Sequence, residues 1–171
     1  MVKYIIVWEE LFMIHMMIGI QGSGKTTFSK ELAKSINAEI VSTDLVRMTN
    51  PGISEDLVWP YVYKRVAECV KNNIEVIFDA TSITPKVRKR FIDNVELHDV
   101  KCEIIAYFFD VDKDICASRV EQRNKDNTQI NIPIEVIYSY SERLVPPTLD
   151  EGFKCIKIVR GGKVVEVITN E

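Results

Sequence analysis

Several features that mark whole classes of protein are absent from this 171-residue sequence. Its two histidines, His15 and His98, have no neighbouring ligand residues, so we expect neither to bind a metal or to act in catalysis. No Cys-x-x-Cys pair occurs among the four cysteines, which are Cys69, Cys102, Cys116 and Cys155. This cysteine pattern argues against a disulfide framework.

The sequence also lacks an excess of basic charge and a long apolar run. Its formal net charge of −3 provides no overall attraction for nucleic acid, so any such contact must be local. Near the N-terminus, Tyr4–Trp8 and Leu11–Ile20 are apolar, but Glu9 and Glu10 separate them. The stretch is too short and too acidic for a membrane span, and it has no small-residue cleavage site of a signal peptide. We therefore expect no membrane association.

The remaining composition, 46% hydrophobic and 27% charged, is ordinary for a soluble globular protein. We expect one domain over residues 1–171, because the length suits a single core and no repeat, low-complexity tract or linker interrupts it. Residues 1–12 are either a short additional strand or an upstream extension, since Met13, Met16 or Met17 would each serve as a start.

The most informative segment runs from Gly19 to Thr26 and reads Gly-Ile-Gln-Gly-Ser-Gly-Lys-Thr, a complete G-x-x-x-x-G-K-[ST] motif. Its glycines allow successive backbone N–H groups to point at an anion. Lys25 can reach the β- and γ-phosphates of a nucleoside triphosphate, and the Thr26 hydroxyl can ligate Mg²⁺. The predicted nucleotide-binding residues of this segment are Gly19, Gln21, Gly22, Ser23, Gly24, Lys25, Thr26 and Thr27.

The flanking segments have the patterns that this motif requires. Before it, the apolar run from Met13 to Ile18 predicts a buried parallel strand. After it, Phe28, Leu32 and Ile36 recur at four-residue steps and predict an amphipathic helix. The positive N-terminal end of that helix favours phosphate further.

Strand and helix patterns alternate along the rest of the chain, which predicts an α/β fold with a mostly parallel central sheet. Proline at position 60 leaves the start of the second long helix open between Ser54 and Trp59. Further strands are predicted at residues 39–43, 74–79, 102–109, 153–159 and 163–168, and further helices at 84–97, 113–123 and 132–144.

Charged residues follow two of the predicted strands, at the edge where an open α/β sheet binds its ligands. Asp44, just past residues 39–43, can accept a proton from an attacking hydroxyl, and Arg47 can hold an anionic group of the acceptor. The alternative is that Asp44 caps a helix and Arg47 is solvated. Asp79, which closes an apolar strand, is placed to lie near Mg²⁺ or its waters.

Two arginines, Arg119 and Arg123, lie four residues apart, and therefore on one face, in the helix before the polar stretch 124–131. In phosphoryl transfer, an arginine on a mobile lid stabilises the negative charge of the equatorial oxygens. The competing interpretation is a solvated basic helix face.

Together these segments resemble the P-loop kinases of the phage-type polynucleotide 5′-hydroxyl kinase group, within a wider family of ATP-dependent phosphotransferases. The similarity covers residues 13 to 160. Its residues are Gly19 to Thr26, Thr43-Asp44 with Arg47, Phe78-Asp79-Ala80-Thr81, Thr84-Pro85 with the basic residues Lys86, Arg88, Lys89 and Arg90, then Arg119, Arg123, Pro146-Pro147-Thr148 and Glu151-Gly152-Phe153.

The resemblance implies a P-loop NTPase-type three-layer sandwich with an arginine-bearing lid, an ATP donor and Mg²⁺. It assigns catalysis to Lys25, Asp44 (the general base) and Arg123, and donor phosphates to Arg119 and Arg123. Arg47 and Thr81 would bind the acceptor, and Thr26 and Asp79 the metal. A nucleotide site with reduced thiols also suggests the cytoplasm.

Three functions remain open from the sequence. The first is a kinase whose acceptor is a single-stranded nucleic-acid 5′-hydroxyl, with the basic residues 86–90 as a local contact strip or merely an exposed surface. The second is a kinase of a small molecule such as a sugar acid, a drug or an activated sugar. The third is a non-catalytic nucleotide-binding module; a GTPase form would need Asn-Lys-x-Asp, which Asn124-Lys125-Asp126-Asn127 does not match. The oligomeric state and the choice between ATP and GTP are not determined by the sequence.

Overall fold

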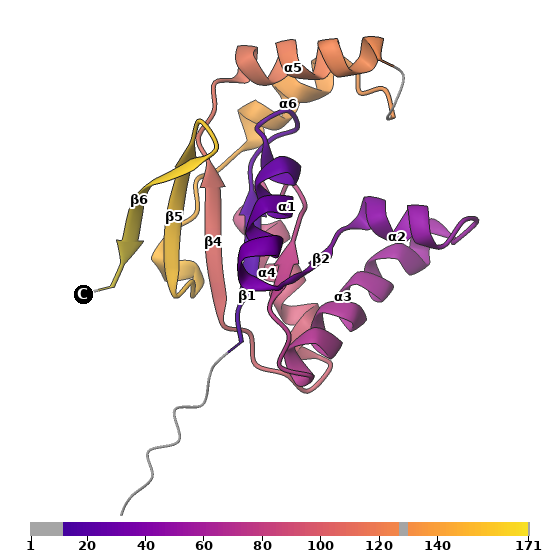
Figure 1. Ribbon diagram of the computed structural model, residues 1–171, viewed down its shortest axis with the longest axis vertical. Helices are drawn as coiled ribbons and strands as arrows, with labels where there is room; N and C mark the ends of the chain where they lie inside the picture. The colour runs from indigo at the N-terminus through magenta and orange to yellow at the C-terminus, as the bar shows by residue number, and fades with distance from the viewer. Residues whose placement is uncertain (1–11, 127–129, 171) are drawn as a thin grey trace, which may run out of the picture.

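The computed structural model describes residues 12–126 and 130–170 (Figure 1). Apart from Phe12, the N-terminal segment 1–12 lies outside the described residues, as do residues 127–129 of the polar stretch. The described elements, in chain order, are β1 (Ile14–Ile18), α1 (Lys25–Ile36), β2 (Glu39–Val41), α2 (Thr43–Thr49), α3 (Glu55–Lys71), β3 (Val76–Phe78), α4 (Pro85–Glu96), β4 (Ile104–Phe109), α5 (Lys113–Lys125), α6 (Ile134–Arg143), the 3-10 turn η1 (Leu149–Glu151), β5 (Cys155–Arg160) and β6 (Lys163–Thr169).

The strands form one six-stranded sheet in the order β2-β3-β1-β4-β5-β6. The first five are parallel, and only β6 runs antiparallel, paired with β5 in a hairpin. The register places Met16 of the central strand β1 opposite Phe78 on one side and Ala106 on the other. The α/β prediction with a mostly parallel central sheet is therefore confirmed.

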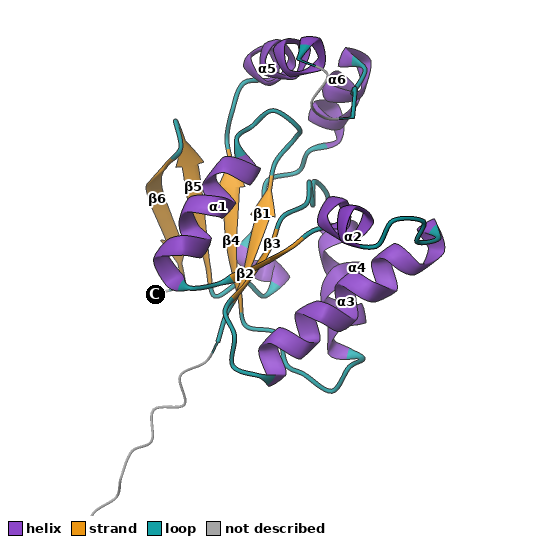
Figure 2. Cartoon of the chain, turned by 45° about the vertical axis from the view of Figure 1, so that its right-hand side comes forward, coloured by secondary structure: helices purple, strands orange, loops and turns teal. Residues whose placement is uncertain are grey.

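Helices cover both faces of this sheet and so form three layers (Figure 2). On one face, α3 and α4 pack against Ile14, Met16 and Ile18 of β1 in the largest core cluster. On the other face, α1 contributes Phe28 and Leu32 to a second cluster with the alternate residues of the strands. Strands buried on both sides have near-continuous apolar sequences, which is why residues 13–18 indicated a central strand.

Local sequence explains where several of the helices begin. The hydroxyl of Ser42 accepts the backbone N–H of Leu45 at 3.1 Å and caps α2, so Asp44 is not the cap. Thr84 caps α4 with Pro85 as the first helical residue, as predicted. Helix α3 begins directly after Ser54, which settles the start that Pro60 had left open.

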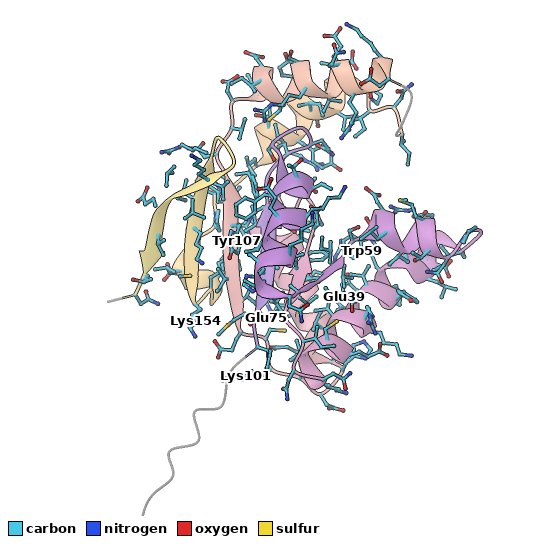
Figure 3. All side chains as sticks on the ribbon, viewed as in Figure 1. Glu39, Trp59, Glu75, Lys101, Tyr107 and Lys154 are labelled. Carbon is cyan, nitrogen blue, oxygen red and sulfur yellow. The ribbon has the colours of Figure 1, made fainter. Side chains whose placement is uncertain are left out.

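A polar row crosses the face under α1, from Glu75 through His15 and Tyr107 to Lys157. Figure 3 labels two of its members, Glu75 and Tyr107. His15 shares hydrogen bonds with Tyr107 Oη at 3.1 Å and with Glu75 Oε2 at 2.9 Å. Burial lowers the pKa of His15, and the bond to Glu75 opposes this shift. The histidine thus belongs to the packing of the sheet.

All four cysteines are free thiols. No helix in residues 12–126 or 130–170 combines the length and the apolar character needed to cross a membrane. Helices α5 and α6 pack together beyond the carboxyl edge of the strands, above the loop that joins β1 to α1 (Figure 1). Their shared apolar contacts include Ile20 of that loop, so this helix pair is attached to the loop itself.

Candidate nucleotide-binding site

The sheet order brings the predicted residues to one edge. Strands β2, β3 and β1 are neighbours, and each ends at the same edge because all three are parallel. The segments that follow them carry Asp44, Asp79 and the Gly19–Thr26 loop respectively. Ligands of open α/β sheets bind at this edge.

Lys25 is buried at the start of α1. Its Nζ donates to the carbonyl oxygen of Ile20 at 2.7 Å and lies 3.4 Å from the Ser23 hydroxyl. Burial lowers the pKa of Lys25 to about 8, with the nearby positive charge of Arg123 acting in the same direction and the carboxylate of Asp79 opposing it. An anion beside this ammonium would favour its charged form.

The loop conformation depends on glycine at two positions. Gly22 and Gly24 have φ values of 81° and 96°, in the left-handed region that L side chains rarely adopt. A Cβ at position 22 would also collide with the carbonyl oxygen of Cys116 in α5. This glycine therefore serves two purposes, the turn of the loop and the close approach of α5.

Asp79 follows β3 next to Thr26 and Lys25. Burial raises its pKa, while the ammonium of Lys25 and the hydroxyl of Thr26 act against that rise. Mg²⁺ keeps several waters and binds one or two protein oxygens together with substrate phosphates. A hydroxyl and a carboxylate beside a phosphate loop fit that preference; no cluster of three or more His, Cys, Asp or Glu suited to a metal occurs in the described part of the chain.

Arg47 of α2 contacts two carboxylates at once. Its Nη1 donates to Asp44 Oδ1 at 3.0 Å, one helical turn earlier. Its Nε and Nη2 donate to the two oxygens of Glu55 at 2.8 and 2.9 Å. The guanidinium, whose side chain is 36% exposed, is thus held by two carboxylates, and the side chain of Asp44 remains 79% exposed.

Helix α5 lies against the phosphate loop through both predicted arginines. Arg119 Nη1 donates to the carbonyl oxygen of Gly22 at 3.2 Å. Arg123 is close enough for its charge to lower the pKa of Lys25. Within residues 12–126 and 130–170, its buried Nε lacks a hydrogen-bond partner, as does Oε1 of Gln21 in the loop. An unpartnered buried guanidinium N–H beside this loop is what a bound polyphosphate would satisfy.

The segment after Asp79 is tied to the loop and to the C-terminal part of the chain. The carbonyl oxygen of Thr81 accepts the N–H of Gly19 at 3.0 Å, so Thr81 lies at the base of the phosphate loop. Fully buried Arg88 donates to the Ser82 carbonyl at 2.9 Å and forms a two-bond pair with Glu151, both bonds at 2.7 Å.

This geometry excludes a continuous basic strip at residues 86–90, one of the two interpretations left open by the sequence. Arg88 is inside the protein, and Lys89 pairs with Asp93 at 2.8 Å on the helix surface. Arg90 lies with its guanidinium 6.0 Å from the ring centre of Trp59. The strip is divided because α4 turns successive residues to different sides, so Lys86 alone of the four is exposed with no ion pair or cation–π contact among the described residues.

Sequence reasoning missed Glu55 and the partner of Arg88. Glu55 is eight residues from Arg47 and is an ordinary acidic residue in the first turn of a helix, so no pattern singled it out. Glu151 had been noted only as part of a short similarity. Its contact with Arg88 joins residues 63 positions apart in the sequence.

Comparison with family models gives a match over residues 14–147 to the family described as the AAA domain. The chain belongs to this AAA domain family. The matched range runs from the start of β1 to the segment after α6 and includes every predicted site residue. No curated protein matches the sequence.

Solved structures share the fold. A chain of the Pnkp1/Rnl/Hen1 RNA repair complex is 23% identical with a TM-score of 0.68, over 78% of this chain and 44% of that one. A chain of the PezAT toxin–antitoxin system of Streptococcus pneumoniae is 17% identical with a TM-score of 0.67, over 92% and 71%. A sugar kinase from a Janibacter species is 14% identical with a TM-score of 0.61, over 86% and 84%.

The present chain spans less than half of the repair-complex chain that it matches. At these identities, the likeness establishes the fold. Together with the family match, it shows that this AAA domain has a P-loop NTPase-like fold of three α/β layers.

Proposed function

We propose that this protein is an ATP-dependent kinase that transfers the γ-phosphate to a hydroxyl group, with the 5′-hydroxyl of a nucleic acid as acceptor. One observation carries the proposal: the neighbouring parallel strands β2, β3 and β1 bring Asp44, Asp79 and Lys25 to a single sheet edge. The charges of Lys25 and Asp44 both influence the pKa of Asp79, which supports the nearness of the proposed donor and acceptor groups. The likeness to a chain of an RNA repair complex supports this acceptor class.

On the donor side, the loop amides and Lys25 hold the β- and γ-phosphates. Arg119 and Arg123 of α5 stabilise the charge that spreads over the equatorial oxygens during transfer. Thr26 and Asp79 would hold Mg²⁺, which would neutralise charge on the phosphate oxygens. The α5–α6 pair, which packs on the loop, excludes water from the transferred group.

On the acceptor side, Asp44 accepts the proton of the attacking hydroxyl, and Arg47 binds a phosphate of the acceptor chain. Thr81, whose carbonyl oxygen holds the base of the loop, is the second proposed acceptor contact. The exposure of Asp44 leaves it accessible to an incoming strand end. Its contact with Arg47 holds the carboxylate toward the acceptor phosphate site.

A small-molecule kinase is the second candidate, and the divided basic surface of α4 favours it. Arg88 is buried and Lys89 is paired, so α4 offers little free positive charge to a long polyanion. The structural likeness to a sugar kinase points the same way.

Incubation with labelled ATP, Mg²⁺ and a set of 5′-hydroxyl oligonucleotides tests the first candidate against a panel of small alcohols and sugar acids. We expect the wild-type protein to transfer label to the oligonucleotides. Asp44→Asn should lower turnover about 10²- to 10⁴-fold, which is the usual contribution of a positioned base, and should leave nucleotide affinity nearly intact. Asp56→Asn removes an equal charge nearby and should retain activity. Label only on a small acceptor would favour the second candidate. Nucleotide binding without transfer to any acceptor would contradict both and leave a non-catalytic module.

A further inference from the structure

The exposed residue Glu55 occupies the side of Arg47 that is best suited to a phosphate. Guanidinium groups grip phosphates and carboxylates with two parallel N–H bonds. In the structure, Nε and Nη2 of Arg47 make that two-bond contact with Glu55, at 2.8 and 2.9 Å. A phosphate and Glu55 cannot use these two donors together.

The contact with Asp44 uses a different donor. Arg47 Nη1 bonds Asp44 at 3.0 Å, on the part of the guanidinium that Glu55 does not touch. Exchange of Glu55 for a phosphate therefore leaves the Asp44–Arg47 contact in place. The general base keeps its orientation while the acceptor binds.

The ion pair between Glu55 and Arg47 can separate readily. The side chains of Glu55 and Arg47 are 73% and 36% exposed, so a displaced Glu55 carboxylate returns to water without a burial cost. Exposed ion pairs are weak, and a doubly bonded phosphate competes well against one. Arg47, Asp44 and Glu55 together carry a formal charge of −1, so the guanidinium offers little net attraction until Glu55 leaves.

We propose that Glu55 is a specificity residue that competes with the acceptor's phosphate for Arg47. This inference rests on the proposed function, in which Arg47 binds the acceptor. It means that an acceptor with a phosphate near its hydroxyl must displace Glu55, and that a weakly anionic compound does not. Glu55 thereby screens acceptors by charge and restrains Arg47 when no acceptor is bound.

Glu55→Gln tests the competition, because glutamine keeps the shape of the side chain and removes its charge. Asp56→Asn is the matched control: it removes an equal charge from the same first turn of α3, and in the described part of the chain Asp56 bonds Ser54, whereas Arg47 bonds Asp44 and Glu55. Inorganic phosphate is titrated while the Arg47 Nε–H signal is followed by NMR, with Arg47→Lys to assign it. We expect Glu55→Gln to bind phosphate roughly two- to five-fold more tightly, the range set by loss of a surface ion pair.

The kinetic arm uses two oligonucleotides that differ only in their first linkage, one an ordinary phosphodiester and the other an uncharged methylphosphonate. Glu55→Gln should lower KM for the phosphodiester by the same two to five times, with KM for ATP and for the methylphosphonate unchanged. Equal changes in Asp56→Asn, or none in Glu55→Gln, would overturn the inference. If Glu55→Gln binds phosphate at Arg47 more tightly but no phosphate is transferred to either oligonucleotide, the competition between Glu55 and phosphate would stand and the polynucleotide acceptor would be refuted.

Discussion

At the scale of single residues, the burial of Lys25 has the most direct consequence for nucleotide binding. The side chain is held among carbonyl and hydroxyl oxygens inside the loop, and burial has lowered its pKa to about 8. A bound triphosphate favours the charged ammonium, so nucleotide binding raises this pKa. Above pH 8, the free protein must therefore take up a proton when it binds nucleotide.

We expect nucleotide affinity to fall by up to about tenfold per pH unit as the pH rises above 8, and to show no such loss from this group below pH 8. Calorimetric titrations from pH 7 to 9.5, in two buffers of different ionisation enthalpy, measure both the affinity and the proton uptake. Lys25→Met should bind weakly and without this pH dependence. A wild-type affinity that stays constant between pH 8 and 9.5 would contradict the expectation.

The sequence predicted Lys25 and its loop because the motif is local: its residues are adjacent and each serves the same anion. The roles of Asp44 and Arg47 were harder, since a helix cap explained them equally well. The structure excludes this explanation, because Ser42 and not Asp44 caps α2. The role of Glu55 could not be predicted, because none of its neighbours along the chain indicates a contact with Arg47.

At the scale of elements, Arg88 joins α4, the segment after β3, and η1. Its guanidinium bonds Glu151, the Ser82 carbonyl and, at 3.1 Å, the Val145 carbonyl. Glu151 also accepts the N–H of Thr148 at 3.1 Å and completes a capping box for η1. These bonds hold the segment that carries Asp79 and Thr81 against the C-terminal part of the chain.

Removal of one partner from this buried pair should be costly. Glu151→Ala leaves the Arg88 charge buried without its carboxylate, and we expect the free energy of unfolding to fall by about 3–5 kcal/mol. Urea denaturation measures it. The exposed pair of Lys89 and Asp93 on the same helix is the control, since Asp93→Ala should cost less than about 1 kcal/mol. The double variant Arg88→Met with Glu151→Ala should lose less unfolding free energy than the two single variants lose in sum. Strictly additive losses would mean that the pair is not coupled.

At the scale of the whole molecule, the site joins two structural units. The sheet and its helices provide the phosphate loop, and the α5–α6 pair packs over that loop through Gly22, Arg119 and shared apolar contacts. A triphosphate bound between them adds charge-assisted bonds to both units and is absent from the unfolded chain. Binding therefore stabilises the fold as a unit.

Nucleotide with Mg²⁺ at 100 times its Kd should raise the unfolding free energy by about 2.7 kcal/mol, and Tm by about 5–10 °C for a chain of this size. Differential scanning fluorimetry measures the shift. Lys25→Ala should lose most of it, and Lys34→Ala, at the exposed end of the same helix, should keep it. An equal shift in both variants would argue against binding at the loop.

The sequence alone determined the phosphate loop, the alternation of strands and helices, and most element starts, because these depend on residues close together in the chain. Only the tertiary structure decided that β3 lies between β2 and β1, that Arg88 is buried against Glu151, and that Glu55 holds Arg47. Each of these contacts joins segments that meet only after the sheet has ordered its strands. Packing and charge in three dimensions therefore determine which residues meet in these contacts, and the local sequence carries no signal for them.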